Sequence, residues 1–277
     1  MNDPIETNAN PFPLHKLEPL FNDLQLPTEP FDPQGTWKHT YQCYTIAKNM
    51  MHNGTLAIYR SPSNNGRILL QIEFQKKLLQ GDLQVLRAKM VCRCDDLTTP
   101  MHWSFDVKTL GQSDDRCEPF DISKTAVLKE GHIEIAYQGN KRHLNLPKSY
   151  SSEWSLFDAV QRLKADRNVV LQFNLLEDFD RFKPEQELSF IESQQISLGQ
   201  TTAQEPNRPR RRQPVHSGNA TIEVEMFRQL GRGISPTFYW RDSFGRLLFV
   251  VAGIEAYVLS THALGIPERK TRRNEQI

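Results

Sequence analysis

Long stretches of the chain alternate apolar and polar residues with a period of two, which is typical of β-strands that bury one face and expose the other. In the segment 85–94 the odd positions include charged residues, and the even positions are apolar: Leu86, Ala88, Met90, Cys92 and Cys94. The same pattern recurs along most of the sequence. It predicts strands within the ranges 36–46, 54–60, 68–74, 85–94, 103–107, 125–128, 133–137, 142–146, 169–175, 188–198, 222–226, 237–241, 246–251 and 254–260. The strand at 188–198 has an interruption near Glu192.

One segment has a clear helical period instead. The residues 151–153, Ser-Ser-Glu, offer an N-cap with a carboxylate in the first turn. Apolar residues then recur at helical spacing, at Trp154, Phe157, Val160 and Leu163. We therefore expect a helix over 153–164, and a second, short helix in the amphipathic stretch 14–24, which Pro19 interrupts.

The order of these elements excludes a βαβ fold, because about ten or more strands follow one another through short turns without alternating crossover helices. The predicted fold class is mainly β: a large curved antiparallel sheet or half-open barrel whose apolar face receives the central helix. We expect an N-terminal arm at 1–33, a single β domain at 34–262 with a mobile loop at 199–218, and a charged tail at 263–277.

The closing segment 236–248 contains a Tyr-Trp-x-Asp-x-x-Gly-Arg-Leu hairpin. In this hairpin and in the order of elements over 36–260, the chain resembles bacterial domains of unknown function related to the lipoprotein-carrier (LolA-like) half-barrel. The resemblance implies an envelope protein with a concave hydrophobic cavity that shelters acyl chains or a partner segment. It implies no catalytic residue. This chain departs from those families in lacking their usual signal peptide and in carrying a basic loop.

Composition supports a globular chain in which any electrostatic partner is bound locally. The 277 residues are 38% hydrophobic and 24% charged, with a formal net charge of +1, so no global field attracts nucleic acid or an anionic membrane. Neither a secretory signal nor an apolar run of about 20 residues is visible. We expect a soluble, cytoplasmic protein, with an envelope location open if a signal precedes this sequence in nature.

Four cysteines raise the question of a metal or a disulfide. Cys92 and Cys94 share the apolar phase of their strand, which predicts that both are reduced and buried, and a Cys-x-Cys pair lacks the second spaced pair of a zinc site. A disulfide from Cys43 to either stays open if their strands are neighbours. We expect no metal and no other cofactor.

Several polar residues are candidates for a site. His102 and Asp106 share one strand face, and with His132 and Tyr239 they could act as general base and partner in an enzyme; a solvated sheet face carries such residues as well. Trp240 and Arg241 are candidate ligand-binding residues, although both could serve only the fold. The candidate anion-binding residues are Arg208, Arg210, Arg211 and Arg212, for which a solvated loop is the alternative.

Two functions follow from these patterns. The first is a non-catalytic binding protein that shelters an apolar ligand or packs a partner segment on its curved sheet. The second is an enzyme that acts on a carbohydrate or another polar substrate across the polar sheet face. The positions of the four candidate catalytic side chains distinguish the two functions, because the enzyme requires these side chains to converge in a cleft.

Overall fold

One continuous sheet of 15 strands accounts for most of the described structure. The computed structural model describes residues 13–21, 30–47, 50–63, 65–78, 81–111, 121–198 and 220–260. The strands are β1 (Trp37–Thr45), β2 (Met51–Ser63), β3 (Arg67–Lys77), β4 (Leu83–Arg93), β5 (Pro100–Leu110), β6 (Asp121–Lys129), β7 (His132–Tyr137), β8 (Asn140–Asn145), β9 (Tyr150–Ser152), β10 (Val170–Glu177), β11 (Arg181–Leu198), β12 (Ala220–Gly231), β13 (Thr237–Asp242), β14 (Leu247–Ala252) and β15 (Glu255–Ser260).

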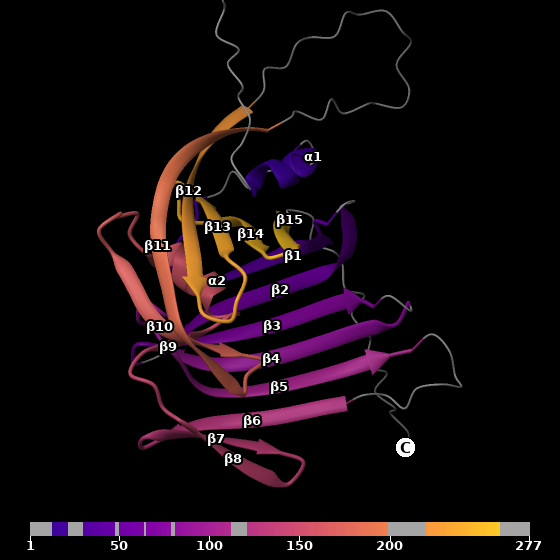
Figure 1. Ribbon diagram of the computed structural model, residues 1–277, viewed down its shortest axis with the longest axis vertical. Coiled ribbons are helices and arrows are strands. Elements are labelled where there is room, and N and C mark those ends of the chain that lie inside the picture. The colour runs from indigo at the N-terminus through magenta and orange to yellow at the C-terminus, as the bar shows by residue number, and fades with distance from the viewer. Residues whose placement is uncertain are drawn as a thin grey trace, which may run out of the picture.

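The sheet runs in the order β8-β7-β6-β5-β4-β3-β2-β1-β15-β14-β13-β12-β11-β10-β9. Neighbouring strands are antiparallel except β9 and β10, which are parallel. Strand β1 pairs with both β2 and β15, so the two halves of the sheet meet where the described ends of the chain come together. Figure 1 shows β1–β8 as one wall and β10–β12 as another, with helix α2 (Leu156–Arg162) between them. The predicted fold class, a mainly β chain with a large open curved sheet and two short helices, is confirmed.

The central helix is shorter than the apolar spacing predicts. It spans Leu156–Arg162 rather than 153–164, because residues 150–152 pair with β10 as strand β9. The predicted N-cap is also wrong: Ser155 occupies that position, and its Oγ lies 2.8 Å from the Oγ of Ser152 instead of capping the helix. Helical period alone therefore placed the start of the helix about one turn too early.

The N-terminal helical segment covers the outside of the C-terminal strands. Its two parts are η1 (Leu14–Leu17), a single 3-10 turn, and α1 (Glu18–Phe21). The ring centroids of Phe21 and Phe249 are 5.3 Å apart, and Figure 1 shows α1 beside β14 and β15. With α1 on one side and α2 on the other, β14 is buried on both faces, which explains why residues 247–251 are apolar without alternation.

The longest hairpin agrees with the sequence in its pairing. Strands β11 and β12 pair antiparallel from Gln186 to Leu198, as expected for the two strands that flank the predicted mobile loop. The interruption predicted near Glu192 is a bulge, at which the register with β12 shifts. The loop itself, at 199–218, and the tail at 263–277 lie outside the described residues.

The predicted burial of the two cysteines is correct for Cys92 and wrong for Cys94. Cys92 is buried and Cys94 is exposed, because β4 ends at Arg93 and the period of two does not extend past the end of a strand. Cys43, Cys92 and Cys94 are free thiols, and Cys117 lies outside the described residues. Burial raises the pKa of both the Cys43 and Cys92 thiols.

Thiol labelling should follow this burial. We expect a maleimide to modify Cys94 in the native protein and to modify Cys43 and Cys92 only after denaturation, since a buried thiol with a raised pKa supplies almost no accessible thiolate. Peptide mass mapping assigns each label and keeps Cys117 apart from the others. Rapid native labelling of Cys92 would contradict this arrangement of the core.

Candidate functional site

A buried ion network fixes the middle of α2 to the opposite wall. Asp158 Oδ1 lies 2.6 Å from Arg60 Nε of β2, and both side chains are almost fully buried, at 0% and 1% exposure. Asp158 Oδ2 accepts a hydrogen bond from Thr98 Oγ1 (2.6 Å) and pairs with Arg162 one turn later on the helix (3.0 Å). The carboxylate thus meets two guanidinium groups and a hydroxyl away from water, which holds α2 against β2 and the turn that precedes β5.

The hairpin of the closing segment, β13–β14, holds the other side of α2. Arg241 Nη1 donates to the carbonyl of Val160 (2.7 Å), and its Nε donates to Glu225 (2.7 Å). Gln161 Oε1 accepts from the backbone N–H of Leu247. Gly245 has a positive φ of 86°, and a Cβ there would lie 2.7 Å from the carbonyl oxygen of Gln161. The hairpin residues therefore form a clamp on the end of the helix.

The tip of the β10–β11 hairpin crosses to the far wall. Phe179 is buried to 1% exposure, with its ring centroid 4.9 Å from that of Phe105 and 6.5 Å from that of Trp103. Next to it, Asp180 forms an ion pair with Lys124 of β6, on the same inner face. We call Phe179 and Asp180 the latch, because they join β10–β11 to β5 and β6 across the inside of the sheet.

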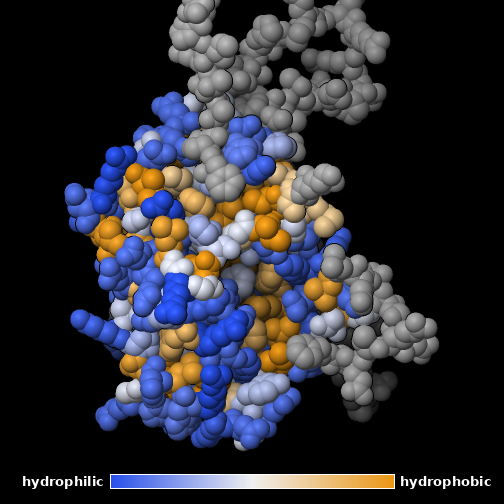
Figure 2. All heavy atoms as spheres, viewed as in Figure 1, coloured by the Kyte–Doolittle hydropathy of each residue, from blue (hydrophilic) through white to orange (hydrophobic). Residues whose placement is uncertain are grey.

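The inner side of the sheet is not completely filled. Figure 2 shows that this face of the molecule is hollowed and that apolar surface gathers in the hollow, over β3–β5. Beside α2, a cavity of about 480 Å³ lies between the helix and the strands β10–β15. Its apolar walls include Trp154, Phe157, Leu175, Val250 and Tyr257. Ile254, at the turn before β15, also lines it and is exposed, so the cavity opens to solvent there.

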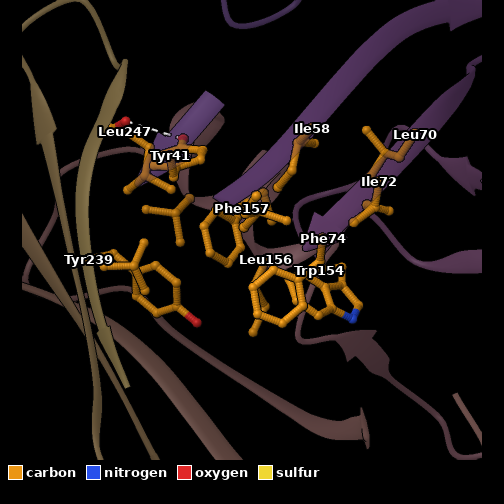
Figure 3. Close-up of a cluster of buried hydrophobic side chains, with 14 of the residues drawn as sticks. Tyr41, Ile58, Leu70, Ile72, Phe74, Trp154, Leu156, Phe157, Tyr239 and Leu247 are labelled. Carbon is orange, nitrogen blue, oxygen red and sulfur yellow. Dashed lines mark hydrogen bonds between the residues drawn. The ribbon is translucent and has the colours of Figure 1, made fainter. Parts of the chain in front are cut away.

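The polar groups of the cavity lie mainly on one side. Tyr239 faces α2, with its ring centroid 6.5 Å from that of Phe157 (Figure 3). The Tyr239 hydroxyl donates to Gln229 Oε1 (3.0 Å), and Gln229 in turn donates to Gln186 (3.2 Å). Burial raises the pKa of Tyr239, so its hydroxyl stays protonated and acts as a fixed polar group.

Glu153 is the acidic residue of the cavity that lacks a basic partner. Glu177 forms ion pairs with Lys183 (2.5 Å) and Arg181 (2.6 Å), and Arg181 also pairs with Asp178. Within the described part of the chain, no base lies within ion-pair distance of Glu153, which accepts a backbone hydrogen bond from Asp178. Burial, reinforced by Asp178 and Glu177, raises the pKa of Glu153 to about 7.

The candidate catalytic residues do not meet. His102 and Asp106 are both exposed on the outer face of β5, four residues apart, a distance of about 13 Å along a strand. His132 lies on the outer face of β7, where its ring is 4.7 Å from that of His143. Tyr239 is on the inner face and buried. None of these four side chains is within hydrogen-bond reach of another one of the four.

The outer face has polar features of its own. A hollow of about 540 Å³ crosses β1–β5 and includes Asp106 together with Tyr59, Arg87 and Lys89, but not His102. On β7, hydrogen bonds from Lys129 and Lys141 lower the pKa of Glu134 to about 2. No group of three or more histidine, cysteine or acidic residues in the described ranges could hold a metal ion.

The two candidate ligand-binding residues, Trp240 and Arg241, do not line the cavity. Trp240 is fully buried on the outer face of β13 and pairs in register with Phe249, beneath the N-terminal helices. Arg241 points inward but contacts Val160 and Glu225 rather than the cavity. The four arginines at 208, 210, 211 and 212 lie outside the described residues.

Sequence reasoning missed Glu153 and its neighbours as a site. It placed Glu153 in the first turn of a helix, and it gave no role to Gln229 or Lys183. One signal was present: Gln229 is a polar residue in the inward phase of a strand whose other inward residues include Phe227, and buried amides are hydrogen-bonded.

These features define a class of protein, an open β-barrel-like sheet with an internal helix and a cavity beside it. No protein-family model matches the chain, and no curated protein matches it in sequence. Among solved structures, it is similar to the crystal structure of a beta-barrel-like protein of the domain of unknown function DUF1849 from Brucella abortus. The TM-score is 0.52 at 11% sequence identity, over 82% of this chain and 96% of that chain. At this identity the likeness shows the fold alone.

The helices also bear on the question of a membrane span. Among the residues that the structure describes, no helix has both the length and the apolar character needed to cross a bilayer.

Proposed function

We propose that this protein is a non-catalytic binding protein that shelters the apolar part of a ligand in the cavity beside α2. The observation that carries the proposal is the cavity itself. At about 480 Å³ it falls within the range of small-molecule sites, and its walls combine aromatic side chains with a few polar groups. A helix that filled the concave face completely would have left no such space.

The relationship to lipoprotein-carrier half-barrels belongs to this proposal. An open, strongly curved sheet with an internal helix and an apolar hollow is what the resemblance implies, and it suits an acyl chain. The alternative of an enzyme on the outer face lacks a cleft in which His102, Asp106, His132 and Tyr239 meet.

Binding of a neutral apolar dye such as Nile red tests the proposal. We expect saturable binding, and we expect Ala252→Trp to weaken it about tenfold or more, because Ala252 lines the cavity and an indole there fills the space. Ala136→Trp is the matched control: Ala136 is half-buried on the outer face of β7, so its replacement should change the affinity by less than about twofold. Native mass spectrometry and solvent extraction of purified protein should also recover a bound apolar molecule.

Two outcomes would contradict the proposal. One is the absence of saturable dye binding to the folded protein. The other is equal binding by Ala252→Trp and the unmodified protein, which would place the dye elsewhere on the surface.

A further inference from the structure

The cavity beside α2 has a charge pattern that selects among apolar ligands. Five charged side chains lie on or next to its polar side, and four of them balance one another: Glu177 and Asp178 against Lys183 and Arg181. Glu153 adds a negative charge to this balanced set. A carboxylate at the edge of an apolar cavity is costly unless an opposite charge or sufficient hydrogen-bond donors face it.

The position of Glu153 also suits contact with a ligand. It directly precedes Trp154 and both residues line the cavity, so a group that binds the carboxylate places its attached apolar part against the indole and Phe157. Glu153 is only partly exposed, and it receives a single backbone hydrogen bond, from Asp178. Its remaining acceptor sites are available to a donor that enters from the open side near Ile254.

From this geometry we propose that the ligand is a cationic amphiphile, an apolar chain with a protonated amine, whose ammonium group pairs with the Glu153 carboxylate. This inference rests on the proposed function and adds the chemical class of the ligand to it. The ammonium completes the missing ion pair and donates up to three hydrogen bonds, to Glu153 and to any other acceptor of the polar side. An anionic chain would meet Glu153 as a like charge.

The raised pKa of Glu153 supports a pH dependence of binding. With a pKa of about 7, Glu153 ionises as the pH rises through neutrality, while an alkylamine stays protonated. Amine binding should therefore strengthen from about pH 6 to about pH 8. The titratable groups that face Glu153 are Glu177 and Asp178, Lys183 of β11, and the hydroxyls of Tyr239 and Tyr257. Of these neighbours, burial holds both tyrosines protonated over this range.

The test compares decylamine, decanol and decanoic acid, which share a chain length and differ in the head group, by displacement of Nile red from the full chain. We expect the amine to bind about tenfold more tightly than the alcohol near pH 8, and the acid to bind most weakly. Glu153→Gln should remove most of the amine's advantage and its pH dependence while leaving decanol within about twofold. Glu187→Gln, the same change on the exposed face of β11, should alter none of the three affinities.

The outcomes separate the two proposals. If none of the three compounds displaces the dye, the proposed function fails and this inference fails with it. If all three bind equally, or if Glu153→Gln leaves the amine's affinity unchanged, the cavity is a binding site without head-group selection and only this inference is wrong. If decanoic acid binds most tightly, Lys183 rather than Glu153 determines the head group. Glu153→Gln is itself expected to fold, because it removes a carboxylate whose raised pKa costs stability at neutral pH.

Discussion

Replacing Asp158 by alanine is expected to destabilise the protein by about 3–5 kcal/mol, because the change leaves two buried guanidinium groups without their counter-charge. Arg60 is 1% exposed and Arg162 is 5% exposed, so neither can turn to solvent without moving the helix or the strand that carries it. Thr98 also loses the acceptor of its hydroxyl. The free energy of unfolding in urea measures the effect.

Two further variants make this prediction specific. Asp158→Asn keeps the side-chain volume and an acceptor for Thr98, so its free energy of unfolding should lie between those of the native protein and the alanine variant. It also provides a measurement if the alanine variant does not fold. Asp106→Ala removes the same kind of side chain from the exposed outer face and should change stability by no more than about 0.5 kcal/mol. A loss below about 1 kcal/mol in Asp158→Ala would show that the network does not anchor α2.

Replacing Phe179 by alanine is the second change with a large expected effect, about 3–5 kcal/mol, the usual cost of deleting a buried phenylalanine side chain. The substitution removes the ring that packs on Trp103 and Phe105, and only the Asp180–Lys124 pair of the latch remains. Alanine is the informative choice because Phe179 has a φ of 60°, and glycine would relieve backbone strain while it removed the ring.

Loss of the Phe179 contact should also lower the local stability of the β10–β11 hairpin. In Phe179→Ala, amide hydrogen exchange should rise in β10 and β11 more than in β2 and β3, since the hairpin loses its contact with the opposite wall. Phe244→Ala is the matched control: Phe244 is 60% exposed, and its removal should cost no more than about 0.5 kcal/mol. Equal losses in the two variants would mean that Phe179 does not hold the sheet closed.

The cavity proposed as a binding site was only partly predictable from the sequence. Tyr239 was singled out as a candidate base, and it does line the cavity, but as a buried hydroxyl bonded to Gln229. His102 and Asp106 follow the polar phase of one strand, and that phase turned out to be the outer face. Alternation tells which residues share a face, but it does not tell which residues of distant strands come together.

Local pattern by itself determined the strands and their inward and outward sides. Fourteen of the fifteen strands overlap a range predicted from alternation, because burial on one face of a strand imposes a period of two that short segments reveal. The bulge near Glu192 was also visible in the sequence, as an interruption of the strand pattern at 188–198. The same local signal failed at Cys94 and at residues 150–152, where a strand ended or a short strand formed through pairing with a distant segment.

Only the tertiary structure decided where the helix sits, how the sheet closes and where a ligand has room. The ion network at Asp158 joins residues almost 100 positions apart, the latch joins β10–β11 to β5 and β6, and Glu153 faces residues from β10 to β15. Such contacts depend on the register and curvature accumulated over many strand pairs, and no short segment encodes them. Alternation therefore defined the faces of the sheet, and the way the sheet folds around α2 made one part of its inner face a cavity.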